Sequence, residues 1–375
     1  MSKMSVNLAG VTLKNPVMTA SGTFGSGAEY SEFVDLNNLG AYIYNDLRIE
    51  FLQKWNISLK KNIDSRILKT DSIQHSSCGL CYTGCRISRP RHICHAFCHD
   101  CTKIIQVYKF TVFRTGTKCS RCSHYLIFQS HSCKIFAHFA HNSTSVLQNP
   151  GIDVFCERDI PFLKKFDTKI IVNVCGKTTE DYCEVVERLG NEPVDMLEIN
   201  VSCPNVKEGG IAFGQNPRAL EAITREVKKY ARQPVIMKLS PNVTDITEMA
   251  RAAEAGGADV VSLINTITGM KIDINRRTFA LANKTGGMSG PAVKPVAVRM
   301  VYQVANAVKI PIIGMGGIAS AEDALEFIMA GATAVSVGTA NFINPYTTQE
   351  VVDGMSAFLE RQKVEDINEL IGCVK

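Results

Sequence analysis

The stretch VDMLEINVSCPN, residues 194–205, is the part of this sequence that best indicates a fold. Its first half is short, apolar and rich in strand-forming residues, and Pro204 ends it because proline has no amide hydrogen to donate to a sheet. The thiol of Cys203 therefore follows a strand end directly, with the amides of Asn200 and Asn205 close by. Polar groups gathered at one strand end are suited to orienting a small polar substrate. Taken alone, a single cysteine is more often a small buried apolar residue than a catalytic group.

Short apolar segments typical of strands alternate with amphipathic segments typical of helices along most of the chain. The expected strands cover residues 16–20, 40–44, 169–174, 195–200, 234–239, 259–264, 311–315 and 333–337. The expected helices lie near residues 29–38, 154–166, 179–189, 217–231, 245–255, 292–308, 321–330 and 348–362. Eight strand-helix units joined by right-handed crossovers predict an α/β fold, the TIM (β/α)8 barrel, with its active site at the carboxyl ends of the strands.

Two segments of alternating polarity predict hairpins outside the barrel wall. Residues 6–13 alternate around an Ala-Gly turn, and we expect this N-terminal hairpin to close the bottom of the barrel. Residues 272–274 and 279–281 predict a second hairpin, which we expect to lie over the barrel mouth. The glycine-rich run GGMSG, residues 286–290, follows this hairpin and would let the backbone approach a ligand closely.

The composition indicates a globular protein with a large core. Apolar residues make up 45% of the 375 residues and charged residues 21%, and no apolar run is long enough to span a bilayer. A net charge of +5 is too small to imply a nucleic-acid partner. The first five residues, MSKMS, lack the apolar core of a signal peptide, so we expect a cytoplasmic protein without membrane contact.

Polar, small or glycine residues stand at the end of nearly every expected strand, namely Ser21, Gly22, Asn173, Asn200, Cys203, Lys238, Asn265, Thr266, Gly316, Gly317, Gly338 and Thr339. The pair Gly316-Gly317 precedes a helix, and Gly338-Thr339 follows the eighth strand. In barrels of this kind, these two loops bind phosphate through backbone amides and a helix N-terminus. Glycines can also serve only to allow tight turns, but two such loops after strands seven and eight favour a phosphate site.

A series of motifs is similar to those of the class 1 dihydroorotate dehydrogenases. In chain order they are NVSCPNVKEGG at residues 200–210, KLSPN at 238–242, NT at 265–266, NKTGGMSG at 283–290, GMGGI at 314–318 and VGT at 337–339. The resemblance covers residues 4–44 and 147–375 and implies a flavin-binding barrel made of residues 1–44 and 147–375. The KEGG continuation, with Phe213-Gly214, is more similar to the NAD-linked 1B branch than to the fumarate-linked 1A branch.

This resemblance implies the oxidation of dihydroorotate to orotate in de novo pyrimidine (UMP) biosynthesis, with FMN accepting a hydride. Cys203 corresponds to the base that removes the C5 proton, a role that a thiol can fill where its surroundings favour the thiolate. The positions that correspond to flavin contacts are Ser21, Asn173, Asn200, Lys238, Ile264, Gly290, Gly316, Gly317, Gly338 and Thr339. The positions that correspond to substrate contacts are Asn200, Asn205, Asn265 and Thr266. Lys238 would hold positive charge where the reduced flavin gains negative charge.

The resemblance also implies a partner. In the 1B branch a second subunit carries FAD and a 2Fe-2S cluster and passes electrons to NAD, within a heterotetramer built on a dimer of catalytic chains. The motifs of this chain leave fumarate open as an alternative final acceptor, and they leave the oligomeric state open as well.

One motif of the family is missing. The family's second strand ends in a Lys-Gly-Thr motif that touches flavin and substrate, whereas here residues 40–44 lead into Asn45-Asp46. Family-like sequence resumes only at LQNPG, residues 147–151. Because the lysine and the substrate loop that follows it are both absent, we expect impaired turnover even where the barrel folds.

Residues 45–146 differ in composition from the rest of the chain, since they hold nine of the 14 cysteines, all eight histidines and the only tryptophan. One interpretation is a zinc module, with weak candidate ligands in paired C-x2-C motifs at Cys78, Cys81, Cys98, Cys101, Cys119 and Cys122. The other is an insertion, or an out-of-frame segment, that replaces the native loop and has no evolved fold. Irregular spacing, poor periodicity and borders that cut through functional motifs favour the second interpretation.

Two other functions remain open at this point. A related flavin barrel acting on another dihydropyrimidine would share the NVSCPN stretch and would differ in which reduced pyrimidine bleaches the flavin. A non-catalytic zinc-binding protein on an inactive barrel would bind stoichiometric zinc and no flavin.

Overall fold

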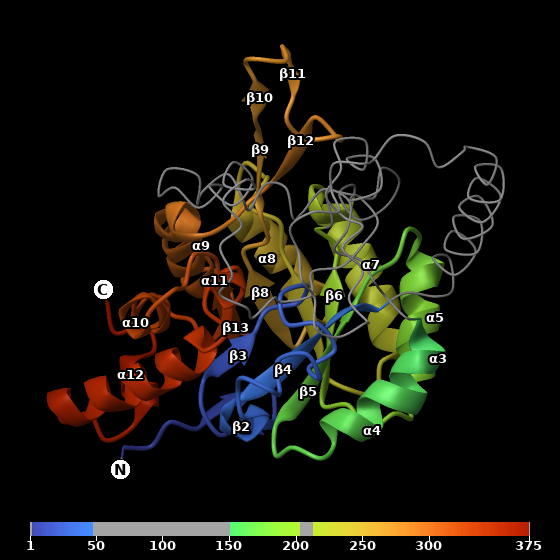
Figure 1. The fold of residues 1–375 in the computed structure, drawn as a ribbon. Helices are drawn as coiled ribbons and strands as arrows, with labels where there is room; N and C mark the ends of the chain where they lie inside the picture. Colours follow the sequence, from blue (N-terminus) through green and yellow to red (C-terminus); the bar gives the residue numbers. More distant parts are fainter. Residues whose placement is uncertain (1, 48–150, 203–212, 375) are drawn as a thin grey trace, which may run out of the picture. The chain divides into compact units, whose positions relative to one another are not determined.

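The computed structural model describes residues 2–47, 151–202 and 213–374. These residues contain a closed barrel of eight parallel strands, in the order β13-β14-β3-β4-β5-β6-β7-β8 (Figure 1). The barrel strands are β3 (Val17–Thr19), β4 (Ala41–Leu47), β5 (Lys169–Val174), β6 (Met196–Asn200), β7 (Val235–Lys238), β8 (Val260–Leu263), β13 (Ile312–Met315) and β14 (Ala334–Val337). The TIM barrel predicted from the alternation of strands and helices is confirmed.

Helices follow the strands and cover the barrel wall (Figure 1). They are α3 (Ile152–Val154), α4 (Ile160–Leu163), α5 (Thr179–Leu189), α7 (Pro217–Tyr230), α8 (Ile246–Ala255), α9 (Lys294–Ala305), α10 (Ala321–Met329), α11 (Ala340–Ile343) and α12 (Thr347–Gln362). Short 3-10 segments are η1 (Leu36–Asn38), η5 (Pro291–Val293) and η6 (Ile367–Leu370). Side-chain caps fix several starts, because Thr178 and Ser320 each close a capping box with the aspartate three residues later. No helix in the described part of the chain is both long and apolar enough to cross a membrane.

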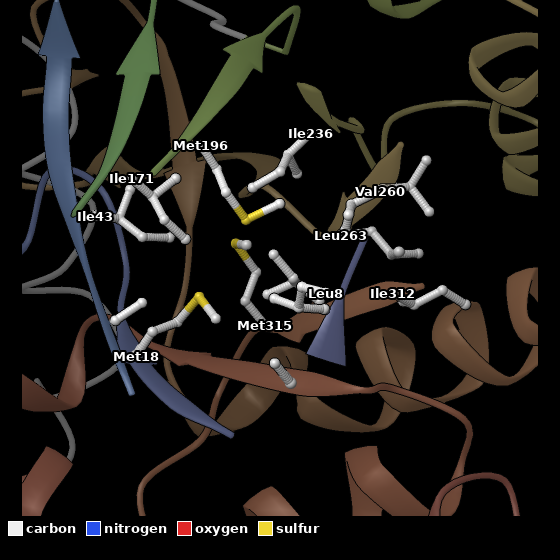
Figure 2. Packing of buried hydrophobic residues seen from close by; sticks show 14 of the residues in the cluster. Leu8, Met18, Ile43, Ile171, Met196, Ile236, Val260, Leu263, Ile312 and Met315 are labelled. Carbon is white, nitrogen blue, oxygen red and sulfur yellow. The ribbon is translucent and has the colours of Figure 1, made fainter. Parts of the chain in front are cut away.

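The core fills the barrel interior with apolar side chains from every strand. Figure 2 shows Ile171, Met196 and Ile236 close together inside the barrel, and each is completely buried. Strands rich in branched apolar residues suit this environment because both of their faces are covered. Side chains alternate between the two faces of a strand, so the residues two positions further along β5, β6 and β7 also face the interior.

The N-terminal hairpin forms as predicted. Strand β1 (Val6–Leu8) pairs with β2 (Val11–Leu13) in antiparallel register. Leu8 is fully buried and joins the core cluster in Figure 2. The hairpin lies at the opposite end of the barrel from β9–β12 (Figure 1), so it closes the end away from the strand termini that carry the polar residues.

The second hairpin also forms and is longer than predicted. Strand β10 (Ile272–Asp273) pairs with β11 (Thr278–Phe279), and β9 (Ile267–Met270) pairs with β12 (Thr285–Met288) to form its base. The ribbon projects away from the barrel at the end opposite the N-terminal hairpin (Figure 1). The sequence signal covered only its tip, because the base contains Gly286 and Gly287, which weaken a strand pattern.

The helix expected over residues 29–38 is wrong. Only the single turn η1 is helical there, and the preceding residues form turns. Gly25 and Gly27 have positive φ values, and Asp35 is extended so that its side chain can accept a hydrogen bond from the amide of Asn37. The helix expected over residues 154–166 lies at 152–163, with the π-helical turn η4 (Phe155–Asp159) between α3 and α4.

Strand β4 continues to Leu47, where a bulge after Tyr44 shifts its pairing with β5. The barrel wall therefore includes residues beyond the boundary at 44 that was expected for the barrel domain. The division of the chain into a barrel and a segment 45–146 stays a prediction, because residues 48–150 lie outside those that the structure describes.

Candidate active site

Strand register forms two pairs of polar residues on neighbouring barrel strands. Asn173 on β5 pairs in register with Glu198 on β6, and Lys238 on β7 pairs with Ser262 on β8. All four residues are buried, and Glu198 has no exposed surface. Each lies two positions after an apolar residue that faces the same interior, so β-strand periodicity alone places these polar groups above the apolar core.

Glu198 is the centre of this group. Its Oε2 accepts hydrogen bonds from Asn173 Nδ2 at 2.5 Å and from Lys238 Nζ at 3.4 Å, and its Oε1 accepts from Ser262 Oγ at 2.7 Å. A buried carboxylate is costly unless it has such donors and a cation beside it. The hydrogen bonds and the lysine therefore allow a charged residue in the middle of a barrel strand.

Lys238 links the buried carboxylate to the rim. Its Nζ also donates to Ser21 Oγ at 2.8 Å, which ties β7 to the loop after β3. An ammonium group has three donors, and Ser21 and Glu198 together account for two of them. The amine thus lies at the carboxyl end of the barrel. Its position is fixed by Glu198 on β6 and by Ser21 in the loop after β3.

A second polar network lies at the end of β6 and in the segments after β6 and β8. Asn200 Oδ1 accepts from Ser202 Oγ at 2.8 Å, and Ser202 Oγ accepts from Asn265 Nδ2 at 2.5 Å. Thr266 follows Asn265, and its carbonyl oxygen accepts from Asn242 Nδ2 at 3.0 Å. The structure therefore brings together the predicted residues Asn200, Asn265 and Thr266 in one connected network.

The glycine loops after β13 and β12 meet each other. Gly316, Gly317 and Gly290 all have positive φ, a region that favours glycine. A Cβ added to Gly317 would lie 2.8 Å from the carbonyl oxygen of Gly290 and 3.0 Å from the amide nitrogen of Lys294. Only a residue without a side chain fits there, so the glycine lets the two loops approach each other closely.

The loop after β14 joins the same region. Thr339 Oγ1 donates to Ser289 Oγ at 2.8 Å, which connects the end of β14 with the loop that contains Gly290. Ile264, after β8, lies 3.2 Å from the position that a Cβ on Gly316 would occupy. The predicted positions Ile264, Gly290, Gly316 and Thr339 therefore belong to one corner of the rim, and Gly338 immediately precedes Thr339.

An ion-pair cluster braces these loops from outside. Lys294 Nζ donates to Asp323 Oδ1 and to Glu326 Oε1, each at 2.7 Å. The other oxygen of Asp323 accepts from the amides of Ala319 and Ser320 at the start of α10. Burial alone would raise the pKa of Asp323, but the hydrogen bonds from Lys294 and the backbone outweigh it and hold that pKa below its usual value. The start of α9 is thereby tied to the loop between β13 and α10.

Strand β4 contains no lysine, and Tyr44 near its end makes a contact with a helix-like segment outside the sheet. Tyr44 donates its hydroxyl hydrogen to Asp159 Oδ2 at 2.6 Å, and Arg158 Nε donates to the same carboxylate at 2.6 Å. Burial, together with the hydrogen bond to Asp159, raises the pKa of Tyr44. This contact fastens β4 to η4.

Several predicted residues lie outside the described ranges. Cys203 and Asn205 belong to the stretch 203–212, and the weak metal candidates Cys78, Cys81, Cys98, Cys101, Cys119 and Cys122 belong to 48–150. Within the residues that are described, no group of three or more His, Cys, Asp or Glu side chains could hold a metal ion. Burial raises the pKa of the Cys156 and Cys183 thiols to about 11, as expected of unreactive structural cysteines.

Sequence reasoning missed Glu198, Ser202, Asn242 and Ser262. Glu198 carried a usable signal, because a charged residue inside the apolar run MLEIN, two positions before Asn200, must face the same interior. Ser262 carried the same signal within VVSL, where it is the one polar side chain of a buried strand.

The fold and the site together define a TIM-barrel enzyme whose carboxyl-terminal rim combines a buried lysine with closely approaching glycine loops. The family model for dihydroorotate dehydrogenase matches residues 142–359, and the chain belongs to this family.

Individual relatives agree with this assignment. The chain is 55% identical over 371 residues to "Dihydroorotate dehydrogenase B (NAD(+)), catalytic subunit" of Lachnoclostridium phytofermentans, covering 99% of each chain. It is 48% identical to the protein of the same description from Alkaliphilus metalliredigens, covering 99% of this chain and 98% of that one. The crystal structure of a DHODH from Eimeria tenella in complex with ferulenol has a TM-score of 0.63 and 20% identity, over 99% of this chain and 88% of that one. At that identity the likeness supports the fold alone.

Proposed function

We propose that this chain oxidises dihydroorotate to orotate in de novo pyrimidine biosynthesis, as the catalytic subunit of an NAD-linked dihydroorotate dehydrogenase. The full-length relatives named for that activity support it. The observation that carries the proposal is the buried Lys238 amine at the barrel rim, held by Ser21 and Glu198 beside a network of amide side chains. A fixed cation next to paired amides suits a reaction in which negative charge moves away from a small polar substrate.

FMN fits the residues of the rim. The phosphate would lie at Gly316, Gly317, Gly338 and Thr339, in loops that approach each other so closely that a Cβ at Gly317 would collide with backbone atoms. Ser21, Asn173, Asn200, Lys238, Ile264 and Gly290 would hold the rest of the cofactor. When bound, FMN supplies a hydride acceptor.

The protein's own residues would bind and orient the substrate. Asn200, Asn265 and Thr266 offer amide and hydroxyl groups that match the carboxylate and ring amides of dihydroorotate. The hydrogen bonds through Ser202 fix the side chains of Asn200 and Asn265, so little side-chain entropy is lost on binding. Asn205 and the base Cys203 would complete the site from the stretch between 203 and 212.

Turnover should be lower than in a relative that keeps the strand-two lysine. Among the described residues, Lys238 supplies the buried cation at the rim. At the end of β4, the side chain of Tyr44 instead donates a hydrogen bond to Asp159, which pairs with Arg158. We therefore expect flavin binding with a slow reductive step.

We further propose a partner subunit that carries FAD and a 2Fe-2S cluster and passes electrons to NAD, within a heterotetramer in the cytoplasm. The description of the relatives as catalytic subunits supports a separate electron-transfer chain. Co-expression with the partner of a close relative should give a complex that reduces NAD with dihydroorotate, whereas the catalytic chain alone should reduce only dyes. Dye reduction that is unaffected by any such partner would contradict this part of the proposal.

The direct test is an anaerobic titration of the purified chain with dihydroorotate while the flavin absorption is followed. Bleaching by dihydroorotate and not by dihydrouracil supports the proposal. Bleaching by another dihydropyrimidine alone would favour the related barrel considered above. A bound flavin that neither substrate bleaches would show that the cofactor site is intact and that the substrate site is not functional. Absence of flavin would reject the enzyme function for this chain.

A further inference from the structure

The buried carboxylate of Glu198 lies within the site, but the proposed reaction assigns it no role. It lies beneath the rim with no exposed surface, and its contacts come from three different strands. Neither oxygen faces solvent, so it cannot exchange protons with a substrate directly. Its one charged neighbour among the described residues is Lys238, at 3.4 Å.

The contacts of Glu198 fix the geometry of Lys238. Asn173 and Ser262 hold the carboxylate from both sides, at 2.5 Å and 2.7 Å, so it cannot turn away from the amine. Lys238 is then held between Glu198 below and Ser21 above. A lysine side chain has four rotatable bonds, and this arrangement selects one position for its nitrogen.

The pair also sets the electric charge of the site. Charges inside a protein interact more strongly than in water because the surrounding dielectric constant is low. Glu198 therefore offsets part of the positive potential that Lys238 would otherwise present to a ligand at the rim. Ser262 and Asn173 in turn stabilise the negative charge of Glu198 through hydrogen bonds.

From this arrangement we infer that Glu198 is a positioning residue that acts through Lys238 to set how readily the bound flavin is reduced. This role rests on the proposed function, since it requires a flavin at the rim. The carboxylate keeps the amine in place and moderates its positive potential, which lowers the tendency of the flavin to take up negative charge. Loss of the carboxylate's charge should make reduction easier, and weaker stabilisation of that charge should make reduction harder.

The test measures the midpoint potential of the bound flavin in three variants of the full chain, by anaerobic reduction against reference dyes. Glu198→Gln removes the charge and keeps the shape, so the potential should rise by ~30 mV, which corresponds to about a tenfold change in the ratio of oxidised to reduced flavin. Ser262→Ala removes a hydrogen bond to Oε1, so the potential should fall by a smaller amount. Glu198→Asp retains the charge and should lie closer to the parent chain than Glu198→Gln does.

Ser336→Ala is the matched control. Ser336 is a buried barrel serine on β14 whose hydroxyl donates to the carbonyl oxygen of Thr19 at 3.2 Å, on a strand that makes none of the described hydrogen bonds to Glu198. Its removal should leave the potential unchanged. A merely structural role for Glu198 would lower flavin content in its variants and would not move the potentials of Glu198→Gln and Ser262→Ala in opposite directions.

The outcomes separate this role from the proposed function. Midpoint potentials that shift in opposite directions in Glu198→Gln and Ser262→Ala support the positioning role. If Glu198→Gln does not fold, a lowered potential in Ser262→Ala still tests that role. Unchanged potentials in variants that bind flavin and are bleached by dihydroorotate would overturn the role of Glu198 and leave the proposed function standing. A parent chain that binds no flavin would overturn both.

Discussion

Two parts of the barrel rim prepare a site by different means. The rim over β5 to β8 uses side chains, with a carboxylate, an amine, amides and hydroxyls held in one buried network. The rim over β12 to β14 uses backbone, with glycines at positive φ whose lack of a side chain lets neighbouring loops approach each other closely. The first region depends on polar side chains that bond to one another, and the second depends on glycines that lack a Cβ.

This difference decides which substitutions each region tolerates. In the side-chain region, removing one polar partner leaves another buried group unpaired, which costs more than the bond itself. In the backbone region, adding a single methyl group is enough to block the contact between two loops. Substitutions that subtract atoms should therefore damage the first region, and substitutions that add atoms should damage the second.

The largest effect should follow Lys238→Met. It leaves Glu198 buried without its cation, and breaking a buried pair by removing one partner typically costs about 3–5 kcal/mol of stability. Chemical denaturation of the variant without flavin measures this cost separately from catalysis. Dihydroorotate-dependent bleaching should be lost in the same variant, because the cation at the rim is gone.

Lys169→Met is the matched control for Lys238→Met. Lys169 is also a barrel-strand residue, the first of β5, and its Nζ lies 3.1 Å from Oδ1 of Asp195. Its side chain, however, is 42% exposed. Exposed ion pairs contribute about 0–1 kcal/mol. Equal destabilisation in the two variants would contradict the view that burial makes the Lys238 pair critical.

The barrel and much of its rim could be predicted from sequence because they depend on local patterns. Buried strands such as β5 were bounded correctly, since a continuous run of apolar, β-branched residues marks the strand. The positions Asn200, Lys238, Gly316 and Gly317 could be placed at the rim from sequence because strand ends of a barrel meet there.

What sequence reasoning missed depends on contacts between distant segments. Glu198 looked like one more residue of a strand, and its importance appears only when Asn173, Lys238 and Ser262 converge on it from three other strands. The false helix over residues 29–38 had the right composition, but glycine turns and the extended Asp35 prevail there. A helix propensity of a few tenths of a kcal/mol per residue is easily overridden by such tertiary constraints.

The second prediction adds one methyl group to the backbone region. Gly317→Ala places a Cβ 2.8 Å from the Gly290 carbonyl oxygen and keeps an alanine at φ +83, so the two loops must move apart. We expect flavin affinity to fall at least tenfold, about 1.4 kcal/mol, measured by the quenching of flavin fluorescence on binding. The N-terminal hairpin supplies the control: Gly10→Ala meets nothing within 4 Å at φ +91, so it should strain the backbone and leave flavin affinity unchanged. Equal loss of affinity in both variants would mean that positive φ, and not the approach of the loops, matters.

The smallest effect should follow Lys294→Met, which removes the brace outside the backbone region. Lys294 is partly exposed, so the loss should be about 1 kcal/mol in the free energy of unfolding. The pKa of Asp323 is lowered in the folded protein, so the stability that this pair contributes is fully present above the unfolded value of about 3.9 and disappears as the pH falls through the lower folded value. Unfolding measured from pH 7 down to the acid range should therefore show the parent and variant curves converging below about pH 4. Glu326→Gln, which leaves the bond between Lys294 and Asp323 intact, should keep most of the parent's pH dependence, and a variant curve that runs parallel to the parent at all pH values would show that the brace acts by packing alone.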